Sequence, residues 1–280
     1  MIYHAPKTLK EFASIASKYG KEAAIVAGFT DVLIKKNFFD NKKTVISTNE
    51  IEEIKKIEET EDKIRIGAGV TFTDLLCSKP IKKHCKALYE AAKVCGSVQI
   101  RNRATIAGNI INASPAADSI PPLMVSDATL ILFKDDKEER IKIKDFFTGP
   151  GKTKLKHGQI VAYIELDKDK DNTISFYRKI GTRKALSIAK ASVAFRAIKT
   201  NGNLSSVNVS YGSVGPTVIN SVKAREYLEN KALTESTIEE ASLMAFGEVS
   251  PIDDVRSTAE YRRLVVKNVM IEELRPFIDN

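Results

Sequence analysis

The sequence predicts an α+β fold, in which a larger part that mixes helices and strands precedes a C-terminal antiparallel sheet with helices. Apolar residues at helical spacing follow Thr8, and a short β-branched run fills residues 43–48. Residues 192–199 and 204–211 alternate apolar and polar around Asn201-Gly202, the usual signal of a two-residue hairpin turn. At 280 residues the chain is long enough for two or three packed units.

Capping and periodicity predict the N-terminal elements. Thr8 and Glu11 have the spacing of a capping box at the start of a helix, and Gly20 is placed to end that helix. The charged segment EIEEIKKIEETED, residues 50–62, is predicted to be a surface connection between two subdomains. Strands are predicted around it over residues 23–27, 43–48 and 63–70, and the subdomains are expected at about residues 1–55 and 56–172.

Caps, glycines and prolines mark the elements of the remaining chain. Thr71 begins a helix, a second helix over residues 84–95 ends at Gly96, and Pro121-Pro122 suits the first turn of a third. The polar stretch DKDKDNT, residues 167–173, predicts the main boundary. The predicted domains are residues 1–172 and 173–280, with a strand over 128–134, a helix over 234–246 and a last helix from a cap at 257–260 to about 278.

Charge and composition narrow the classes of function. The net charge of +8 is carried by scattered lysines, which favours a solvated surface over a dedicated anionic partner. Aromatic residues make up only 7% and no nucleic-acid-binding motif is present, so nucleic acid is not an expected partner. The start MIYHAPKTLKEF lacks a signal-peptide pattern and no apolar run is long enough for a bilayer, so we expect a cytoplasmic protein with no membrane partner.

The cysteines and histidines do not indicate a metal site. Cys77, Cys85 and Cys95 are odd in number, and their spacing suits neither a disulfide framework nor CxxC ligation. Helical apolar spacing around the last two indicates that most of these thiols are buried. The three histidines are far apart in the sequence. We therefore expect no metal ion and no iron-sulfur cluster within this chain.

Two segments, IVAGFTDVL at 25–33 and TIAGN at 105–109, share small residues, a threonine and a carboxylate or amide. Glycine permits a positive φ and a close approach, so successive backbone N–H groups can point at one oxyanion, and threonine adds a hydroxyl donor. Together the loops could hold a diphosphate from both sides. Each alone is more often a simple turn, and Asn109 and Asn112 could equally do no more than satisfy loop backbone. A Walker A loop and a G-x-G-x-x-G are both missing from the sequence, which disfavours a Rossmann fold.

Other chemistry finds little support near the second segment. Ser114 precedes Pro115 without the pattern of a nucleophile elbow, and no histidine is placed to activate it. Asp118 has two interpretations: a general base or, more often for a carboxylate just before a helix, a cap or an acceptor for a sugar hydroxyl. The residues taken alone therefore predict a nucleotide-type cofactor held by two glycine-containing loops, with no catalytic side chain.

Seven segments of the chain occur in the order and at the spacing of a known family. They are YHAPKTLKEF, VAGFTDVL, IRIGAGVTFTDL, VQIRNRATIAGNIINASPAADSIPPLMVSDA, DFFTGPGKTKL, FYRKIGTRKALSIAKA and STAEYRRLVV. The chain thereby resembles, over nearly its whole length, the FAD-binding subunit of the molybdenum hydroxylases. This family includes xanthine dehydrogenase, the medium subunit of carbon monoxide dehydrogenase, and nicotinate dehydrogenase.

The resemblance implies a two-subdomain PCMH-type FAD-binding α/β domain, followed by a C-terminal domain with a three-stranded antiparallel sheet and a helical bundle. It implies that Asp118 accepts from the ribose or adenine side of FAD, and that Val161 packs near the cofactor. Lys179 and Tyr177 would lie near the flavin ring, where a cation favours the reduced anionic flavin. Residues implied to wrap the FAD diphosphate are Ile25, Val26, Ala27, Gly28, Phe29, Thr30, Asp31, Val32, Thr105, Ile106, Ala107, Gly108 and Asn109.

The same resemblance implies an oxidoreductase subunit that passes electrons from an iron-sulfur subunit through FAD to NAD or another acceptor. A molybdopterin-binding large subunit would act on the substrate. Phe29 and Ala107 stand where the family often has glycine, and Phe29, the bulkier change, could alter flavin access. Two alternatives stay open: a free-standing flavin oxidoreductase of the same fold, and a scaffold protein that has lost FAD.

Overall fold

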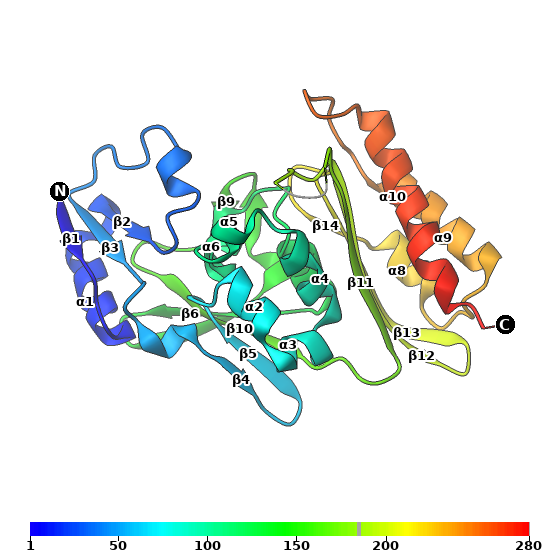
Figure 1. The fold of residues 1–280 in the computed structure, drawn as a ribbon, viewed down its shortest axis with the longest axis horizontal. Coiled ribbons are helices and arrows are strands. Elements are labelled where there is room, and N and C mark those ends of the chain that lie inside the picture. The colour runs from blue at the N-terminus through cyan, green and yellow to red at the C-terminus, as the bar shows by residue number, and fades with distance from the viewer. Residues whose placement is uncertain (184–185, 280) are drawn as a thin grey trace.

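The computed structural model describes residues 1–183 and 186–279. Three parts follow one another along the long axis of the molecule, each built on its own β-sheet (Figure 1). Buried apolar side chains form one large core shared by the first two parts and a second in the third. None of the helices in the described ranges is long and apolar enough to cross a membrane. The cytoplasmic location stays a prediction.

A small parallel sheet forms the N-terminal part. Its strands are β1 (Ile2–His4), β3 (Thr44–Ser47) and β2 (Ala23–Val26), in that spatial order, and α1 (Leu9–Tyr19) packs against it. The Thr8 hydroxyl accepts from the Glu11 N–H as predicted, and Gly20 follows the helix at φ +49°. The Glu11 carboxylate accepts from the Lys7 N–H, one residue earlier than a capping box requires.

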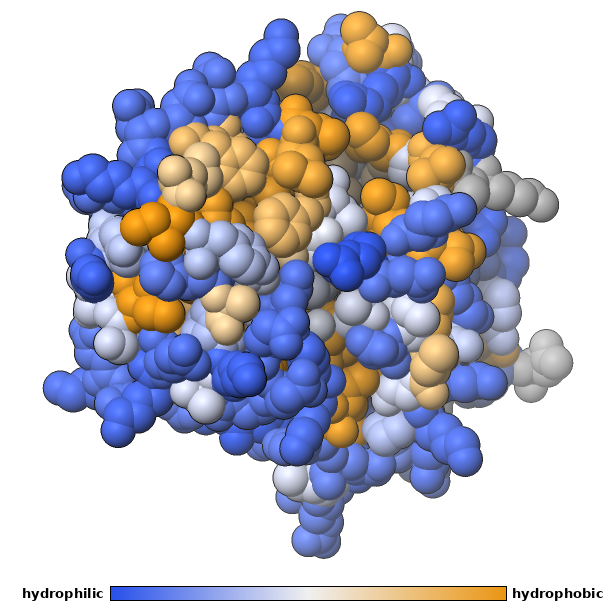
Figure 2. Space-filling view, turned by 60° about the vertical axis from the view of Figure 1, so that its left-hand side comes forward, coloured by the Kyte–Doolittle hydropathy of each residue, from blue (hydrophilic) through white to orange (hydrophobic). Residues whose placement is uncertain are grey.

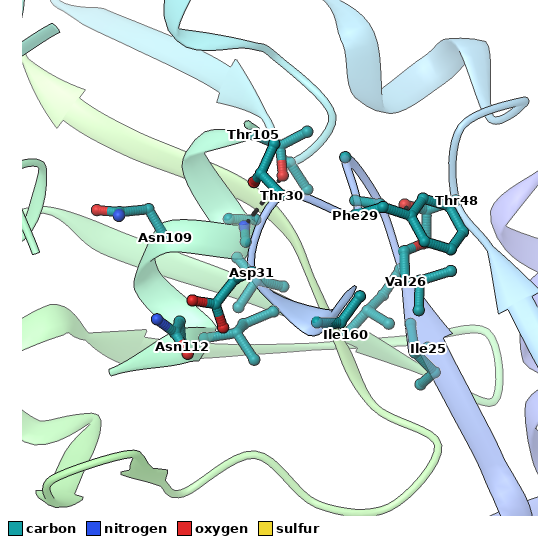
Figure 3. Close-up of a pocket in the computed structure, with 18 of the residues that line it drawn as sticks. Ile25, Val26, Phe29, Thr30, Asp31, Thr48, Thr105, Asn109, Asn112 and Ile160 are labelled. Carbon is teal, nitrogen blue, oxygen red and sulfur yellow. Dashed lines mark hydrogen bonds between the residues drawn. The ribbon is translucent and has the colours of Figure 1, made fainter. Parts of the chain in front are cut away.

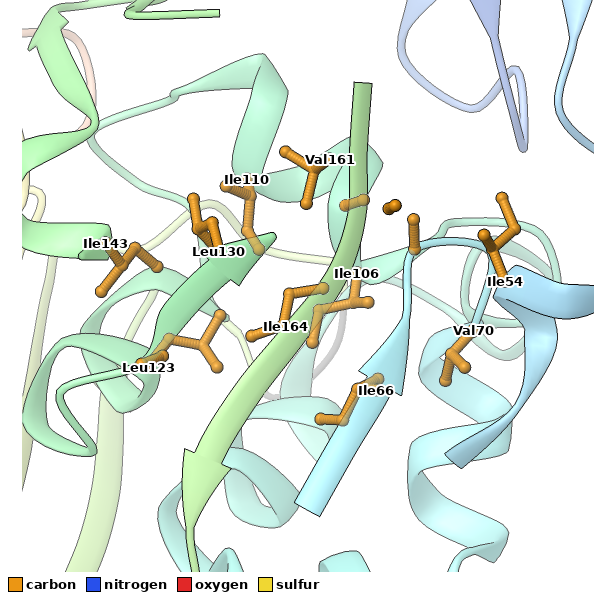
Figure 4. Close-up of a cluster of buried hydrophobic side chains, with 14 of the residues drawn as sticks. Ile54, Ile66, Val70, Ile106, Ile110, Leu123, Leu130, Ile143, Val161 and Ile164 are labelled. Atoms are coloured by element: carbon orange, nitrogen blue, oxygen red, sulfur yellow. The ribbon is translucent and has the colours of Figure 1, made fainter. Parts of the chain in front are cut away.

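A five-stranded antiparallel sheet forms the middle part, in the order β4-β5-β10-β6-β7. Its core contains Ile66, Ile106, Leu130 and Ile164 from the sheet and the helix beside it (Figure 4). The strands are β4 (Ile57–Glu59), β5 (Lys63–Gly67), β10 (Ile160–Asp167), β6 (Thr129–Lys134) and β7 (Lys137–Lys142), with a small pair β8 (Phe147–Gly149) and β9 (Lys152–Thr153). The helices are α2 (Phe72–Cys77), α3 (Lys79–His84), α4 (Lys86–Val94), α5 (Val98–Arg101), α6 (Ile106–Asn112) and α7 (Ile120–Val125).

The segment at residues 50–62 is not the surface connection that its charge predicted. It forms a 3-10 turn (Glu52–Lys55) and strand β4, and Ile51 and Ile54 are 0% and 1% exposed in the core. The Ile54 carbonyl accepts from the Gly69 N–H and comes so close to Gly67 that a Cβ there would lie 2.1 Å from its oxygen. Two isoleucines among charged residues anchor the segment, and the run is too short to show a clear period.

A four-stranded antiparallel sheet and three helices form the C-terminal part. The predicted hairpin is present, because Asn201 and Gly202, both at positive φ, connect β12 to β13. The strands are β11 (Thr173–Ile180), β12 (Ala191–Thr200), β13 (Asn203–Gly212) and β14 (Ile219–Asn220), so a two-residue strand adds to the three expected. The helices are α8 (Lys223–Leu228), α9 (Glu235–Glu248) and α10 (Ala259–Leu274).

The last helix differs from its prediction at both ends. Thr258, rather than Ser257, supplies the side-chain cap of α10. The helix ends at Leu274 and a 3-10 turn (Arg275–Phe277) follows, because Pro276 has no backbone N–H with which to continue the helical hydrogen bonds. Helices α8 and α10 cover one face of the C-terminal sheet, and α4 and α7 of the middle part contact the other (Figure 1). Residues of α4 and α7 therefore contact residues of β11 in a buried layer between the middle and C-terminal parts.

Candidate cofactor site

A cavity of about 420 Å³ lies between the loop after β2 and the start of α6 (Figure 3). The fold thus brings together the two glycine-containing segments that the sequence singled out. The cavity is lined by every residue from Ile25 to Val32, by Thr105, Ala107, Gly108 and Asn109, and by Val161. All of these residues were predicted to contact the cofactor.

Gly28 is required by close approach rather than by its backbone angle. A Cβ on Gly28 would lie 1.8 Å from the carbonyl oxygen of Arg103, so only glycine lets the two loops touch here. The positive φ that the sequence suggested belongs instead to the next residue, Phe29, at +62°. The glycine that the family resemblance implies at this position would adopt such a φ without strain, whereas L-residues rarely do.

The loop after β2 presents backbone donors that have no acceptor in the part of the chain that the structure describes. Among the described residues, the N–H groups of residues 28–31 donate to no carbonyl and to no side chain. The Ala107 N–H, in the first turn of α6, is equally without a described acceptor. Successive backbone N–H groups without a protein acceptor that line one cavity form a site suited to an anionic ligand.

The other N–H groups at the start of α6 are already bonded. The Thr105 hydroxyl accepts from the Gly108 N–H at 3.1 Å, and the Ile106 N–H donates to the Val70 carbonyl (Figure 3). Ile106 does not line the cavity, although we predicted it to wrap the diphosphate. As the first helical residue it faces the sheet, and its side chain is fully buried in the core (Figure 4).

The Asn109 side chain connects α6 to the start of α7 through hydrogen bonds. Its Oδ1 accepts from the N–H and from the hydroxyl of Ser119, at 3.3 and 2.7 Å, and its own N–H donates to the Thr105 carbonyl. The Asn109 side-chain oxygen is therefore already bonded to Ser119, in agreement with the interpretation that this asparagine satisfies polar groups of the nearby chain. Asn112, by contrast, accepts from Lys35 Nζ inside the cavity lining.

Several residues of the cavity wall were not predicted from the sequence. Lys35 Nζ lies 2.8 Å from Asp31 Oδ2, and both side chains are about half exposed at the mouth. The i,i+4 spacing of these two residues was a signal that could have identified the pair. The other unforeseen wall residues come from loops, strands and helices whose arrangement in space the sequence does not show; they are Phe38, Thr48, Ile54, Ala68, Ile100, Ile111 and Ile160.

Asp118, Tyr177 and Lys179 form a second, separate cluster that does not line the cavity. Lys179 Nζ donates to Asp118 Oδ2 at 2.8 Å, and the Tyr177 hydroxyl donates to Asp118 Oδ1 at 2.8 Å. Lys179 Nζ also donates to the Val94 carbonyl at 3.2 Å. The cluster joins the segment before α7 to β11, and the Asp118 and Lys179 side chains are 9% and 6% exposed. Contact of these three residues with FAD stays a prediction.

Burial dominates the electrostatics of this second cluster. It raises the pKa of the Asp118 carboxyl above its usual range, although Lys179 and Tyr177 act to lower it. It raises the pKa of the Tyr177 hydroxyl well above its usual value, and that of the neighbouring Cys95 thiol to about 12. Cys95 and Cys85 are buried as predicted, whereas Cys77 is exposed. Over residues 1–183 and 186–279, no group of three His, Cys, Asp or Glu side chains is placed to hold a metal ion.

Comparison with known proteins identifies the family. Residues 1–167 match the family described as "FAD binding domain in molybdopterin dehydrogenase", and residues 176–275 match "CO dehydrogenase flavoprotein C-terminal domain". These matches define an FAD-dependent oxidoreductase subunit. The chain belongs to the FAD-binding subunits of the molybdenum hydroxylase family, as its resemblance implied. The predicted fold class and the predicted cofactor, FAD, are both confirmed.

Relatives and solved structures agree with this assignment. The xanthine dehydrogenase FAD-binding subunit of Escherichia coli O157:H7 is 31% identical over 270 residues, which are 95% of this chain and 92% of that protein. The nicotinate dehydrogenase FAD-subunit of Eubacterium barkeri is 30% identical over 274 residues, with the same two coverages. A structure of carbon monoxide dehydrogenase from Hydrogenophaga pseudoflava superposes with a TM-score of 0.93 at 26% identity, over 98% of this chain and 96% of that one.

Proposed function

We propose that this chain is the electron-transferring FAD subunit of a heteromeric molybdenum hydroxylase. It would accept electrons from an iron-sulfur subunit and deliver them through FAD to NAD or another acceptor, while a molybdopterin-binding large subunit acts on the substrate. The observation that carries the proposal is the group of free backbone N–H donors on two loops around one cavity. Names of the relatives, a xanthine dehydrogenase and a nicotinate dehydrogenase subunit, support the assembly with such partners.

The donors around the cavity fit the diphosphate of FAD. Residues 28–31 would bind its oxygens from one side, and the Ala107 N–H would do so from the other, because their N–H groups are unpaired. Thr30 adds a hydroxyl, and Ile25, Val26 and Val161 add apolar wall. Bound FAD supplies the redox chemistry, since a flavin exchanges one or two electrons. The chain itself binds and orients the cofactor and shields part of it from water.

Two further parts of the proposal concern the rest of the chain. We propose a division into an FAD-binding domain of residues 1–172, with subdomains of about 1–55 and 56–172, and a C-terminal domain of residues 173–280. We also keep the proposal that Asp118, Tyr177 and Lys179 border the ribose and the flavin ring. A shift of the flavin absorption spectrum in Lys179→Met would support that contact, and an unchanged spectrum would contradict it.

Gly108→Asp tests the diphosphate site most sharply. An aspartate in the first turn suits the helix dipole, but a Cβ at residue 108 would lie 2.9 Å from the Thr105 hydroxyl, so we expect a similar moderate fall in melting temperature in Gly108→Asp and in Gly108→Ala. The introduced carboxylate would stand beside the diphosphate, so we expect FAD to bind at least 100-fold more weakly. Gly108→Ala adds bulk without charge and is the matched control. Equal FAD affinity in Gly108→Asp and the wild type, measured by titration of the apoprotein, would overturn the site.

Assembly and electron acceptor need a second experiment. Co-expression with neighbouring genes that encode a molybdopterin-type chain and a small iron-sulfur chain is expected to yield a complex with flavin absorbance. Anaerobic NADH added to that complex would bleach the flavin if NAD is the acceptor. A colourless chain that takes up no added FAD would contradict the proposal and favour a scaffold. Turnover of a substrate by the isolated chain would favour a free-standing oxidoreductase.

A further inference from the structure

Phe29 holds a backbone conformation that is costly for its residue type. Its φ is +62°, and most of the other described non-glycine residues at positive φ are Asn, Asp, Ser or Ala. Phe29 is the aromatic exception among them. A bulky side chain in this region signals strain, and strain persists where the surrounding structure or a function requires it. The turn alone therefore does not explain why a phenylalanine stands at this position.

The Phe29 ring forms part of an aromatic wall. Phe29 packs with Phe38 and Phe39 against Ala24, Val26 and Val45, apolar side chains on one face of the N-terminal sheet. Phe38 and Phe39 meet edge to face, with ring centroids 5.0 Å apart. In Figure 3 the Phe29 ring lies beside Val26 and Thr48. Phe29 and Phe38 both line the cavity, whereas Phe39 does not, so the wall has one face toward the cavity.

The two ends of the cavity differ in chemistry. Asp31, Lys35 and Asn112, together with the free N–H groups, make one end polar. Figure 3 shows Phe29, Val26, Ile25 and Ile160 together at the other end, which is therefore apolar. Ile54 and Val161 also line the cavity and are each 1% exposed in the main core, so the core closes the cavity on that side. A flat aromatic ring attached to a diphosphate matches such a division.

We propose that Phe29 is a positioning residue that packs against the adenine ring of FAD and holds it at the apolar end of the cavity. The inference rests on the proposed FAD site. Adenine is favoured over the isoalloxazine because the redox-active ring must stay within reach of a partner and an acceptor, and the apolar end is closed. One residue then supplies both an N–H for the diphosphate and a ring for the base, which accounts for the strained φ.

The N-terminal part of the molecule also carries exposed apolar side chains just after the cofactor loop. Figure 2 brings the N-terminal part of the molecule forward and shows apolar side chains gathered on that face. Leu33 and Ile34, which follow the cofactor loop, are 68% and 79% exposed. They do not line the cavity, so substitutions there separate a surface effect from a cavity effect. Leu33→Ala is therefore a second control for the experiment below.

Binding of cofactor fragments tests the proposal. The full-length chain, freed of FAD, is titrated with FAD, ADP and FMN for the wild type, Phe29→Gly and Phe29→Leu. Stacking on an aromatic side chain is commonly worth a factor of about ten in affinity. We expect FAD and ADP to bind about tenfold more weakly to Phe29→Gly and severalfold more weakly to Phe29→Leu, with FMN unchanged. Phe39→Leu removes a ring of the same wall outside the cavity and should bind all three as the wild type does.

Three results would overturn the proposal. ADP affinity equal to wild type in both Phe29 variants would show that the ring does not touch the base. Weaker FMN binding with unchanged ADP binding would place the isoalloxazine, and not adenine, against Phe29. An equal loss of FAD and ADP affinity in Leu33→Ala would show that the effect arises from the exposed surface and not from the cavity. Failure of the FAD site itself is distinguishable, because then the wild-type chain binds neither FAD nor ADP. Thermal unfolding shows that each variant is folded. In Phe29→Gly the relief of the strained φ offsets part of the packing lost with the ring, so only a small change in melting temperature is expected.

Discussion

The cofactor cavity and the Asp118 cluster use their polar groups in opposite ways. Around the cavity, the N–H groups of residues 28–31 have no described partner, and one of these residues is held at an unfavourable φ. In the cluster, both Asp118 oxygens are bonded, to Lys179 and to Tyr177, and the cluster is buried. Free donors indicate where a ligand binds directly, whereas the mutually satisfied charges stabilise the contact between the middle and C-terminal parts, with or without FAD beside them.

Loss of the buried lysine is the change with the largest expected effect. Lys179→Met leaves the Asp118 carboxylate buried without its cation, which should lower the free energy of unfolding by about 3–5 kcal/mol. Lys35→Met is the matched control at the cavity, because its pair with Asp31 is half exposed and worth less than about 1 kcal/mol. Chemical unfolding of both variants measures the contrast. Equal destabilisation by Lys179→Met and Lys35→Met would contradict the difference drawn between the buried Asp118 cluster and the half-exposed pair at the cavity.

The pH dependence of the same variant sharpens the comparison. Burial raises the pKa of folded Asp118 above its unfolded value, so the native state binds a proton more readily, and stability from this group falls as pH rises between the two values. Without Lys179 the pKa of Asp118 should rise further. The destabilisation by Lys179→Met is therefore expected to shrink as pH falls from 8 to about 5. Unfolding curves at several pH values check this, and a constant difference would exclude Asp118 as the cause.

Removal of one free N–H at the cavity should cost affinity rather than stability. Ala107→Pro deletes the unpaired donor in the second position of α6, and α7 already tolerates the same arrangement at Ile120-Pro121. We expect FAD to bind roughly 10- to 100-fold more weakly, since a hydrogen bond to a charged group contributes about 1.5–3 kcal/mol. Calorimetric titration with FAD measures the loss. Wild-type affinity in a folded Ala107→Pro chain would show that this N–H does not bind the cofactor.

Asp31→Asn has the smallest expected effect on FAD affinity, but the sign of that effect separates two roles of the carboxylate. Asp31 holds Lys35 Nζ at 2.8 Å, and its carboxylate stands near the position proposed for the diphosphate. Its neutralisation frees the lysine and removes a like charge, so FAD should bind severalfold more tightly, with an effect that decreases as salt increases. Titrations at low and high salt measure this. Weaker binding in Asp31→Asn would indicate instead that the carboxylate accepts from a sugar hydroxyl.

The sequence predicted the parts of the site that are local and missed those that depend on distant contacts. Gly28 and Gly108 stood out because each lies in a local segment that combines small residues with a threonine and a carboxylate or amide, a pattern suited to binding an oxyanion. The partners of Asp118 could not be read from local pattern, because the Lys179 bond depends on how β11 packs against the helices before it. Ile51 and Ile54 were missed for a different reason, since charged neighbours hid two core residues in a short run.

Hydrogen–deuterium exchange of the full-length chain with and without FAD tests the central claim most directly. The free N–H groups of residues 28–31 should exchange rapidly in the apoprotein and become strongly protected when FAD binds, because phosphate oxygens then accept from them. Peptides from β12 and β13, already bonded within the C-terminal sheet, serve as the internal reference. Unchanged exchange at residues 28–31 in a chain that has taken up FAD would contradict the account.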